Sequence, residues 1–429
     1  MQYLIIFVIC FLILALIRVP LGHSMLGAAI ICFLINGKSL GMVASTAYSS
    51  IDVFAFLAIP GFILAGNLML HGKIADTILL ELNNITKGTK SVLGSFAVIL
   101  SMLFGTILGS AAATVALVGG MLIPKMNELG YSRDESAALI AASGILGLLI
   151  PPSIPGIMYA IAAGESIMDV WISTIPIALL VGLLWIIVNI VKCAKMKKPV
   201  SLPTSKTEQA TTSKRFSVHS IPAILAPVVI FAGIFGGIFT PTEASAVIVV
   251  YSLIVGLFVY KGLNRNNLYD IILKSAKSSA AIVILIAFAS VAGRFFTLIN
   301  LPKMLVDFMG TLNLTPIGFL IVVNVLLIIV GMFMETNTAI LILTPLLLPI
   351  AKSFGINPIH FGAIMLFNLQ LGMLTPPFAG NIFVVCKVAD VSFDKVIRPI
   401  IPYILVALPV LVITTYFPNF SLFFVNLFR

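Results

Sequence analysis

Charged residues are scarce in this sequence. Asp, Glu, Lys and Arg make up 9% of the 429 residues, whereas 60% are hydrophobic and the mean hydropathy is +1.18. A soluble protein carries roughly 25% charged residues, so the composition excludes a soluble chain and predicts one polytopic membrane protein. The four cysteines show no paired spacing, which gives no sign of a disulfide framework. The first apolar run has no basic residue before it and no small-residue cleavage site after it, which indicates a span rather than a signal peptide.

The motifs of soluble catalysis are also missing. The only approach to a phosphate-binding G-x-x-x-x-G-K-[ST] loop is Gly37-Lys38-Ser39, and Cys32 stands where its first glycine belongs. There is no H-E-x-x-H zinc motif and no nucleophile–base pair. The sequence therefore predicts a protein that is not an enzyme, that needs no cofactor, and that draws energy from an ion gradient or from another subunit. The net charge of +10 sits in short loops between apolar runs, so membrane topology accounts for it and no nucleic-acid partner is expected.

Two apolar stretches are interrupted by paired prolines. Pro151-Pro152 lies within Ser143–Tyr159, and Pro376-Pro377 lies within Gln370–Val384, 225 residues later. A proline removes an N–H donor and pushes the preceding residue out of helical geometry, so neither stretch forms a continuous helix. Paired, interrupted apolar segments in two halves of a chain point to the binding site of a transporter.

The same 225-residue offset relates other prolines and glycines, which predicts an internal duplication. Each half should hold five transmembrane helices and one re-entrant hairpin, because a long apolar run with a small or polar centre fits two half-length helices that meet inside the protein. The first repeat covers 1–191, with scaffold helices in 1–70, an arm helix at 71–90, a hairpin at 92–128, a broken helix at 137–163 and a closing helix at 170–191. A basic linker covers 192–216. The second repeat covers 217–429, with scaffold helices in 221–299 (the last at 280–299), an arm helix at 301–314, a hairpin at 317–351, a broken helix at 361–388 and a closing helix at 400–417.

The distribution of Lys and Arg tests this topology. Five crossings per half invert the second repeat relative to the first. With the linker in the cytoplasm and both termini on the outer side, 20 of the 25 Lys and Arg lie on the cytoplasmic side, as the positive-inside rule requires. Full crossings by both hairpins would also give an odd number, so the charges support inversion but leave re-entrance open.

Polar residues at membrane depth are the candidates for chemistry. Glu335-Thr336-Asn337-Thr338 stands at the centre of the second hairpin, and an ionisable residue at that depth indicates function. Glu335 could equally cap the half-helix that follows it, since the helix dipole favours an acid there. Thr240-Pro241-Thr242-Glu243 and Ser132-Arg133-Asp134-Glu135 are predicted capping boxes.

At the broken helices the candidate ligands are backbone carbonyls. Those near Gly147 and Ile150, and those near Gly372 and Thr375, lose helical partners to the prolines. Unpaired carbonyls with a hydroxyl are hard oxygen ligands that suit Na⁺, and half-helix N-termini opposite them favour an anionic substrate group. The alternative is that the Pro-Pro steps are only kinks.

Taken together, five segments resemble the large membrane subunit of TRAP (tripartite ATP-independent periplasmic) transporters over essentially the whole length. They are Phe56–Asn67, Gly119–Pro124, Gly147–Ser153, Gly236–Ala244 and Leu371–Pro377. The resemblance implies an elevator-type scaffold and transport domain and Na⁺-driven import of a carboxylate across the bacterial inner membrane. It also implies a periplasmic binding protein and a small four-helix membrane subunit, expected here as a separate chain. The sequence looks most like the sialic acid members, and C4-dicarboxylate members share the same motifs.

The resemblance also implies site residues. Two Na⁺ sites are expected, mostly through carbonyls, at Gly105, Gly147, Ile150 and Ser153 and at Gly331, Gly372, Thr375 and Phe378. The substrate is expected near the hairpin centres, at Ser110, Thr114, Glu335, Thr336, Asn337, Thr338 and Asn381. The first centre, Ser110 to Thr114, lacks the Asn of a symmetric pair, which shifts the expected substrate contacts toward the second half. Two rival functions stay open: a stand-alone Na⁺–carboxylate symporter and a channel with a continuous polar pore.

Overall fold

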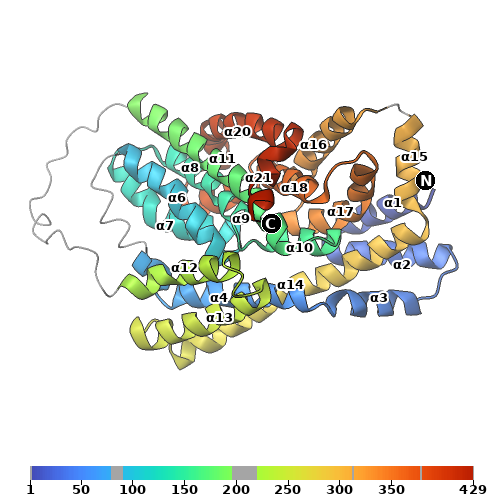
Figure 1. Cartoon of the computed structure of the whole chain (residues 1–429). Coiled ribbons are helices and arrows are strands. Elements are labelled where there is room, and N and C mark those ends of the chain that lie inside the picture. The colour runs from blue at the N-terminus through green and yellow to red at the C-terminus, as the bar shows by residue number, and fades with distance from the viewer. Residues whose placement is uncertain (1, 79–89, 196–219, 312–313, 377–378, 429) are drawn as a thin grey trace, which may run out of the picture.

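The computed structural model describes residues 2–78, 90–195, 220–311, 314–376 and 379–428. Within these ranges the chain forms helices and no strand (Figure 1), which confirms the predicted all-α fold class. Among the described residues, seven helices are long and apolar enough to cross a membrane, or eight if the bent pair Arg133–Leu149 and Ile154–Ala163 counts as one span. The predicted polytopic membrane protein is therefore confirmed.

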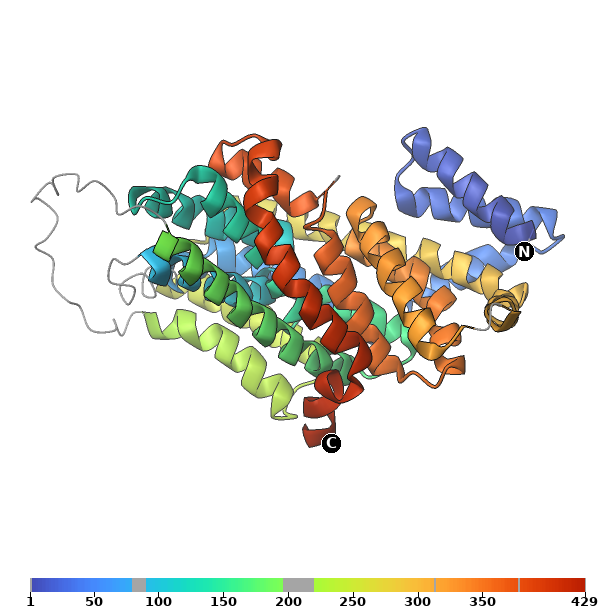
Figure 2. The same cartoon turned by 90° about the horizontal axis from the view of Figure 1, so that it is seen from above.

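One group of helices comes from the start of each half. Its members pack on one another, with α14 against α2, α3 and α4, and α13 against α4. They are α1 (Gln2–Leu16), α2 (Leu21–Ile35), α3 (Gly41–Ile51), η1 (Phe54–Leu57), α4 (Ala58–His71), α12 (Ile221–Phe235), α13 (Pro241–Ile254), the π-helical turn η3 (Val255–Val259) and α14 (Arg265–Leu298). Figure 2 shows the α1–α2 pair at one end of the molecule. The segments predicted to form the scaffold lie in this group, and their role as a scaffold stays a prediction.

The second group contains the predicted hairpins, broken helices and closing helices. The first half supplies α6 (Lys90–Leu108), α7 (Ala111–Glu128), α8 (Arg133–Gly144), α9 (Leu146–Leu149), α10 (Ile154–Ala163) and α11 (Ile167–Lys195). The second half supplies α16 (Pro316–Phe333), α17 (Thr336–Ser353), α18 (Pro358–Gly372), α19 (Gly380–Ala389), α20 (Phe393–Tyr416) and α21 (Pro418–Phe428). The helix α15 (Leu301–Thr311), at the predicted second arm, packs against α14 and α17 and so touches both groups.

The helix bounds repeat at the offset that the sequence predicts. Helix α7 covers 111–128 and α17 covers 336–353, both displaced by 225 residues, and α10 and α19 correspond within one residue. The two halves also exchange partners. Helix α10 packs on α17 and α19 packs on α7, while the closing helices α11 and α20 pack on α18 and α8 of the opposite half. The second group is therefore one interlocked body.

Two ion pairs repeat this exchange. Arg133 at the start of α8 lies 3.8 Å from Asp390 just after α19, and Lys352 at the end of α17 lies 3.9 Å from Glu165 just after α10. Each pair joins the end of a broken helix in one half to the region between hairpin and broken helix in the other. Glu165 and Asp390 are themselves 225 residues apart.

Several predicted bounds were wrong. The span expected at 280–299 begins at Arg265, because Asn264 and Asn267 form a capping box that starts α14 in polar sequence. Helices α3 and α21 were not predicted, and α11 continues to Lys195, past the expected start of the linker at 192. The remainder of the linker, to residue 216, lies outside the described residues. Of the first predicted arm helix at 71–90, the structure describes a helical stretch at 74–78, and 79–89 lie outside the described residues.

The predicted caps differ in outcome. Thr240 and Glu243 form both hydrogen bonds of a capping box at the start of α13, as expected. Ser132 accepts from the Glu135 N–H at 3.4 Å, but the Glu135 side chain turns instead toward Lys192 of α11, 3.7 Å away. The prediction of a complete box at Ser132 was wrong, because an ion pair to a neighbouring helix competes for the same carboxylate.

Candidate functional site

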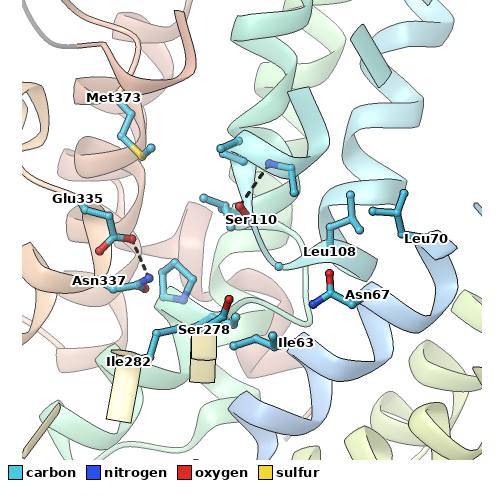
Figure 3. A pocket seen from close by; sticks show the side chains of 17 residues that line it. Ile63, Asn67, Leu70, Leu108, Ser110, Ser278, Ile282, Glu335, Asn337 and Met373 are labelled. Carbon is cyan, nitrogen blue, oxygen red and sulfur yellow. Dashed lines mark hydrogen bonds between the residues drawn. The ribbon is translucent and has the colours of Figure 1, made fainter. Parts of the chain in front are cut away.

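The centres of both predicted hairpins meet at one cavity of about 380 Å³ (Figure 3). We call the break at Gly109-Ser110, between α6 and α7, the first tip, and the break at Met334-Glu335, between α16 and α17, the second tip. We call the space between them the tip cavity. Its lining consists of Ile63, Asn67, Leu70, Leu108, Gly109, Ser110, Ala111, Ala112, Ala113, Leu148, Ile154, Pro155, Ser278, Ile282, Glu335, Asn337 and Met373.

The first tip is built from a glycine and a serine. Gly109 has φ +58, a left-handed conformation that suits a residue without Cβ. Ser110 then takes an extended conformation and caps α7, its hydroxyl accepting from the Ala113 N–H at 3.3 Å. Because the residues that follow are alanines, the N-terminal end of α7 lies open to the cavity, and such an end favours an anionic group.

The second tip carries Glu335, the one ionisable side chain among the lining residues that the structure describes. Glu335 caps α17 by accepting from the Thr338 N–H at 3.2 Å, and it also accepts from the Asn337 amide at 2.7 Å. In Figure 3, Glu335 and Asn337 lie on the opposite side of the cavity from the α4 side chains. The capping interpretation of Glu335 is thus confirmed, and the same side chain also faces the cavity.

The other predicted substrate residues do not line the tip cavity. Thr114 is buried and donates to the Ser110 carbonyl at 2.9 Å, and buried Thr336 donates to the Met373 sulfur at 3.0 Å. Thr338 is buried as well. Asn381 of α19 is buried against α8, where its amide approaches the Ala141 carbonyl at 3.5 Å. These four residues shape the two tips and their supports.

The first predicted Na⁺ set surrounds the break of the first broken helix. Gly105 of α6 and Gly147 of α9 approach so closely that a Cβ on either would overlap the other's Cα. Ser153 caps α10, accepting from the Gly156 N–H at 3.3 Å, and donates to the Leu148 carbonyl at 2.5 Å. Ile150 has an extended backbone conformation between α9 and α10. Four residues predicted from resemblance therefore lie around one backbone crossing.

The second set repeats this geometry. A Cβ on Gly372 would lie 2.7 Å from the Gly331 Cα, and one on Gly331 would lie 2.8 Å from the Leu369 carbonyl oxygen. The Thr375 hydroxyl donates to the Leu371 carbonyl at 3.0 Å, so its lone pairs can still accept. The Gly372 carbonyl accepts from the Thr375 N–H at 2.9 Å, which uses one lone pair of an oxygen predicted to be unpartnered. Phe378 lies outside the described residues.

The first helix group also contributes to this cavity, which was not predicted from the sequence. Ile63, Asn67 and Leu70 of α4, with Ser278 and Ile282 of α14, form its other wall (Figure 3). Asn67 ends the segment Phe56–Asn67, which contributed to the family resemblance but was not predicted to bind substrate. The available signal was a polar amide inside an apolar span, which packing alone does not require.

Comparison with known proteins agrees with this architecture. Residues 8–420 match the family described as "Tripartite ATP-independent periplasmic transporter, DctM component". The isethionate TRAP transporter permease protein DctMQ of Oleidesulfovibrio alaskensis is 36% identical over 414 residues, which are 95% of this chain but only 64% of that relative. The C4-dicarboxylate large permease protein DctM of Pseudomonas aeruginosa is 35% identical over 92% of each chain. The sialic acid large permease protein SiaM of Vibrio cholerae is 32% identical over 95% of each.

Solved structures show the same fold at low sequence identity. The YdaH transporter of Alcanivorax borkumensis superposes with a TM-score of 0.61 at 14% identity, covering 88% of each chain. MtrF of Neisseria gonorrhoeae gives 0.58 at 14% identity and covers 89% of this chain and 83% of that one.

Proposed function

We propose a function that starts from one established point: the chain belongs to the DctM component family of tripartite ATP-independent periplasmic transporters. It is a large permease subunit of a secondary transporter, a multi-pass membrane protein and not an enzyme. The relatives differ in what their names say they carry, including isethionate, C4-dicarboxylates and sialic acid.

The substrate we propose is a carboxylate of the acidic sugar class, with sialic acid as the leading candidate. The observation that carries this is the tip cavity, where tips from both halves meet. Its polar lining is made of hydroxyl, amide and carboxylate groups, and no Lys or Arg stands among the described residues of the lining. Hydroxyl groups of a sugar acid match such a lining. The open N-terminal end of α7 offers a place for the substrate carboxylate.

Na⁺ is the proposed coupling ion and is carried as cargo with the substrate. The two glycine crossings bring carbonyls of broken helices together with Ser153 in one half and Thr375 in the other. Hard oxygen ligands of this kind suit Na⁺. Movement of the second helix group along α4 and α14 would carry tips and ions together, as in an elevator.

The proposed assembly is tripartite. TRAP large subunits work with a small membrane subunit and a periplasmic binding protein. For this chain we propose a four-helix small subunit as a separate partner, location in the bacterial inner membrane, a cytoplasmic linker and termini on the outer side. The relatives for C4-dicarboxylates, at similar identity and coverage, make a C4-dicarboxylate the second candidate substrate.

Uptake into proteoliposomes that hold this chain and its small subunit tests the proposal. Labelled sialic acid and labelled succinate are offered with and without a Na⁺ gradient, and with and without the cognate binding protein. Sialic acid uptake that needs both conditions is the expected result. Uptake with Na⁺ alone would indicate a stand-alone symporter, ohmic flux without Na⁺ would indicate a channel, and uptake of succinate alone would replace the substrate.

A further inference from the structure

Asn67 is a polar residue of α4 that lies outside both hairpins and both broken helices. It lines the tip cavity beside Ile63 and Leu70, across from Glu335 and Asn337 (Figure 3). An uncharged amide that only joins two helices could lie anywhere along their contact. This one lies where the helix contact opens into the cavity.

Its hydrogen bond to α14 fixes which end of the amide is held. The Ser275 hydroxyl donates its only proton to the Ile271 carbonyl at 2.8 Å. It can therefore only accept from Asn67, and the Asn67 Nδ2 donates to it at 2.9 Å. The described hydrogen bonds leave the other end of the amide, the acceptor Oδ1, unpaired.

The groups facing Asn67 are rich in acceptors. Glu335 is an acceptor when ionised, and Ser110 and Ser278 add hydroxyls that accept as well as donate. Among the described residues the lining has no basic side chain, so a second carboxylate of a substrate would face the Glu335 carboxylate without a counter-charge. A hydroxyl in the same place would donate to these acceptors. The cavity thus favours an acid whose remote end carries hydroxyl groups.

We propose that Asn67 is a specificity-determining residue that accepts a hydrogen bond from a substrate hydroxyl, with Ser275 positioning its amide. This rests on the proposed function, since it assumes that the tip cavity receives the substrate. It adds that one determinant of substrate choice stands on the α4–α14 wall rather than on the hairpins. The ligand class is a hydroxylated carboxylate.

L-Malate and succinate make a matched pair for the test, because they differ by one hydroxyl on the same skeleton. Binding of malate, succinate and sialic acid is measured calorimetrically, in Na⁺ buffer, on the complex of this chain with its small subunit in lipid nanodiscs. No binding protein is present, so its own selectivity does not enter. The variants are Asn67→Ala and Ser275→Ala, and the control is Ser279→Ala.

Ser279 is a close control for Ser275. It lies on the same helix, is buried, and makes the same bond to the carbonyl four residues before it, at 2.8 Å. In the part of the chain that the structure describes, Ser279 has no hydrogen-bond partner on α4 and does not line the cavity. Ser279→Ala therefore removes the same hydrogen bond within α14 that Ser275→Ala removes, but it leaves the contact between α14 and Asn67 in place.

The unmodified complex is expected to prefer malate to succinate. One neutral hydrogen bond corresponds to a roughly 2- to 10-fold change in Kd. Asn67→Ala should weaken malate and sialic acid by that factor and leave succinate unchanged. Ser275→Ala, which keeps the amide but frees it to rotate, should lose part of the same preference, and Ser279→Ala none.

Three results would overturn the inference. They are equal loss for all three acids in Asn67→Ala, an unchanged malate-to-succinate ratio in that variant, and a Ser279→Ala effect as large as that of Ser275→Ala. If sialic acid does not bind but malate and succinate do, the proposed substrate fails while the malate ratio still decides the role of Asn67. If none of the three binds, the substrate class is wrong and the inference falls with it.

Discussion

The crossing of Gly105 over Gly147 allows a sharp test of the broken-helix geometry. The change is Gly105→Ala, which adds one methyl group. That methyl would lie 2.7 Å from the Gly147 carbonyl carbon and 3.1 Å from its nitrogen, and closer still to its Cα. All three are backbone atoms, so no side chain can rotate away.

The expected loss of stability follows from this overlap. Restoring carbon–carbon contacts of about 3.5–4.0 Å to the Gly147 Cα requires α6 and α9 to separate by roughly 1.5–2 Å. Overpacking of this kind costs about 1–3 kcal/mol, and a clash between two backbones belongs at the upper end. The separation would also part the carbonyls proposed to hold Na⁺, so the Na⁺ concentration for half-maximal stabilisation should rise.

Gly120→Ala is the matched control. Gly120 lies in the neighbouring helix α7 and is exposed, and a Cβ added there would have no described atom within 4 Å apart from its chain neighbours and the backbone of its own helix. Alanine there should stabilise the helix by about 0.5–1 kcal/mol. Thermal unfolding in nanodiscs, with and without Na⁺, compares the two. Equal unfolding midpoints, or a Gly105→Ala variant with an unchanged Na⁺ response, would refute the reasoning.

Three further predictions rest on single contacts. Thr375→Val keeps the shape but removes a hydroxyl, and should raise the Na⁺ concentration needed for half-maximal uptake; an unchanged Na⁺ curve would exclude Thr375 as a ligand. Glu335→Ala should lower the free energy of unfolding by about 1 kcal/mol through loss of the cap on α17, whereas Glu335→Gln should retain most of that stability and lose substrate binding. If both variants bind substrate normally, Glu335 acts as a cap only. Asp390→Asn should change the free energy of unfolding by less than about 0.5 kcal/mol, because the ion pair is exposed: the Asp390 side chain is 98% exposed and that of Arg133 is 62% exposed. A larger decrease, measured by chemical denaturation, would show that this pair contributes more than a surface ion pair does.

The sequence predicted the elements whose signal is local. Pro151-Pro152 marked the break between α9 and α10, and the small residues from Gly105 to Thr114 marked the first tip. The distances along the chain that define these breaks are short, so periodicity and proline chemistry were sufficient. The start of α14 was missed because Arg265 and its neighbours are polar, and polarity was taken as the end of a span.

The cavity wall could not be predicted in the same way. Asn67 and Ser275 are 208 residues apart, and no local sequence pattern around either residue predicts a contact with the other. Their meeting depends on how α4 and α14 pack, which is a long-range property. Asn381 is a second case of long-range packing. The family resemblance pointed to this residue of α19, but its amide lies against α8, and no described residue of α19 lines the tip cavity.

The exchange of partners between the two halves has a consequence for biosynthesis. Helix α10 leaves the ribosome long before α17, the helix against which it packs. Synthesis from Ala163 to Ser353, at about 5–20 residues per second, takes roughly 10–40 s. During that time α10 lacks its native neighbour α17. Native packing of the second helix group can then be completed only late in translation, and chains truncated before α17 should be substrates for membrane quality control rather than folded half-transporters.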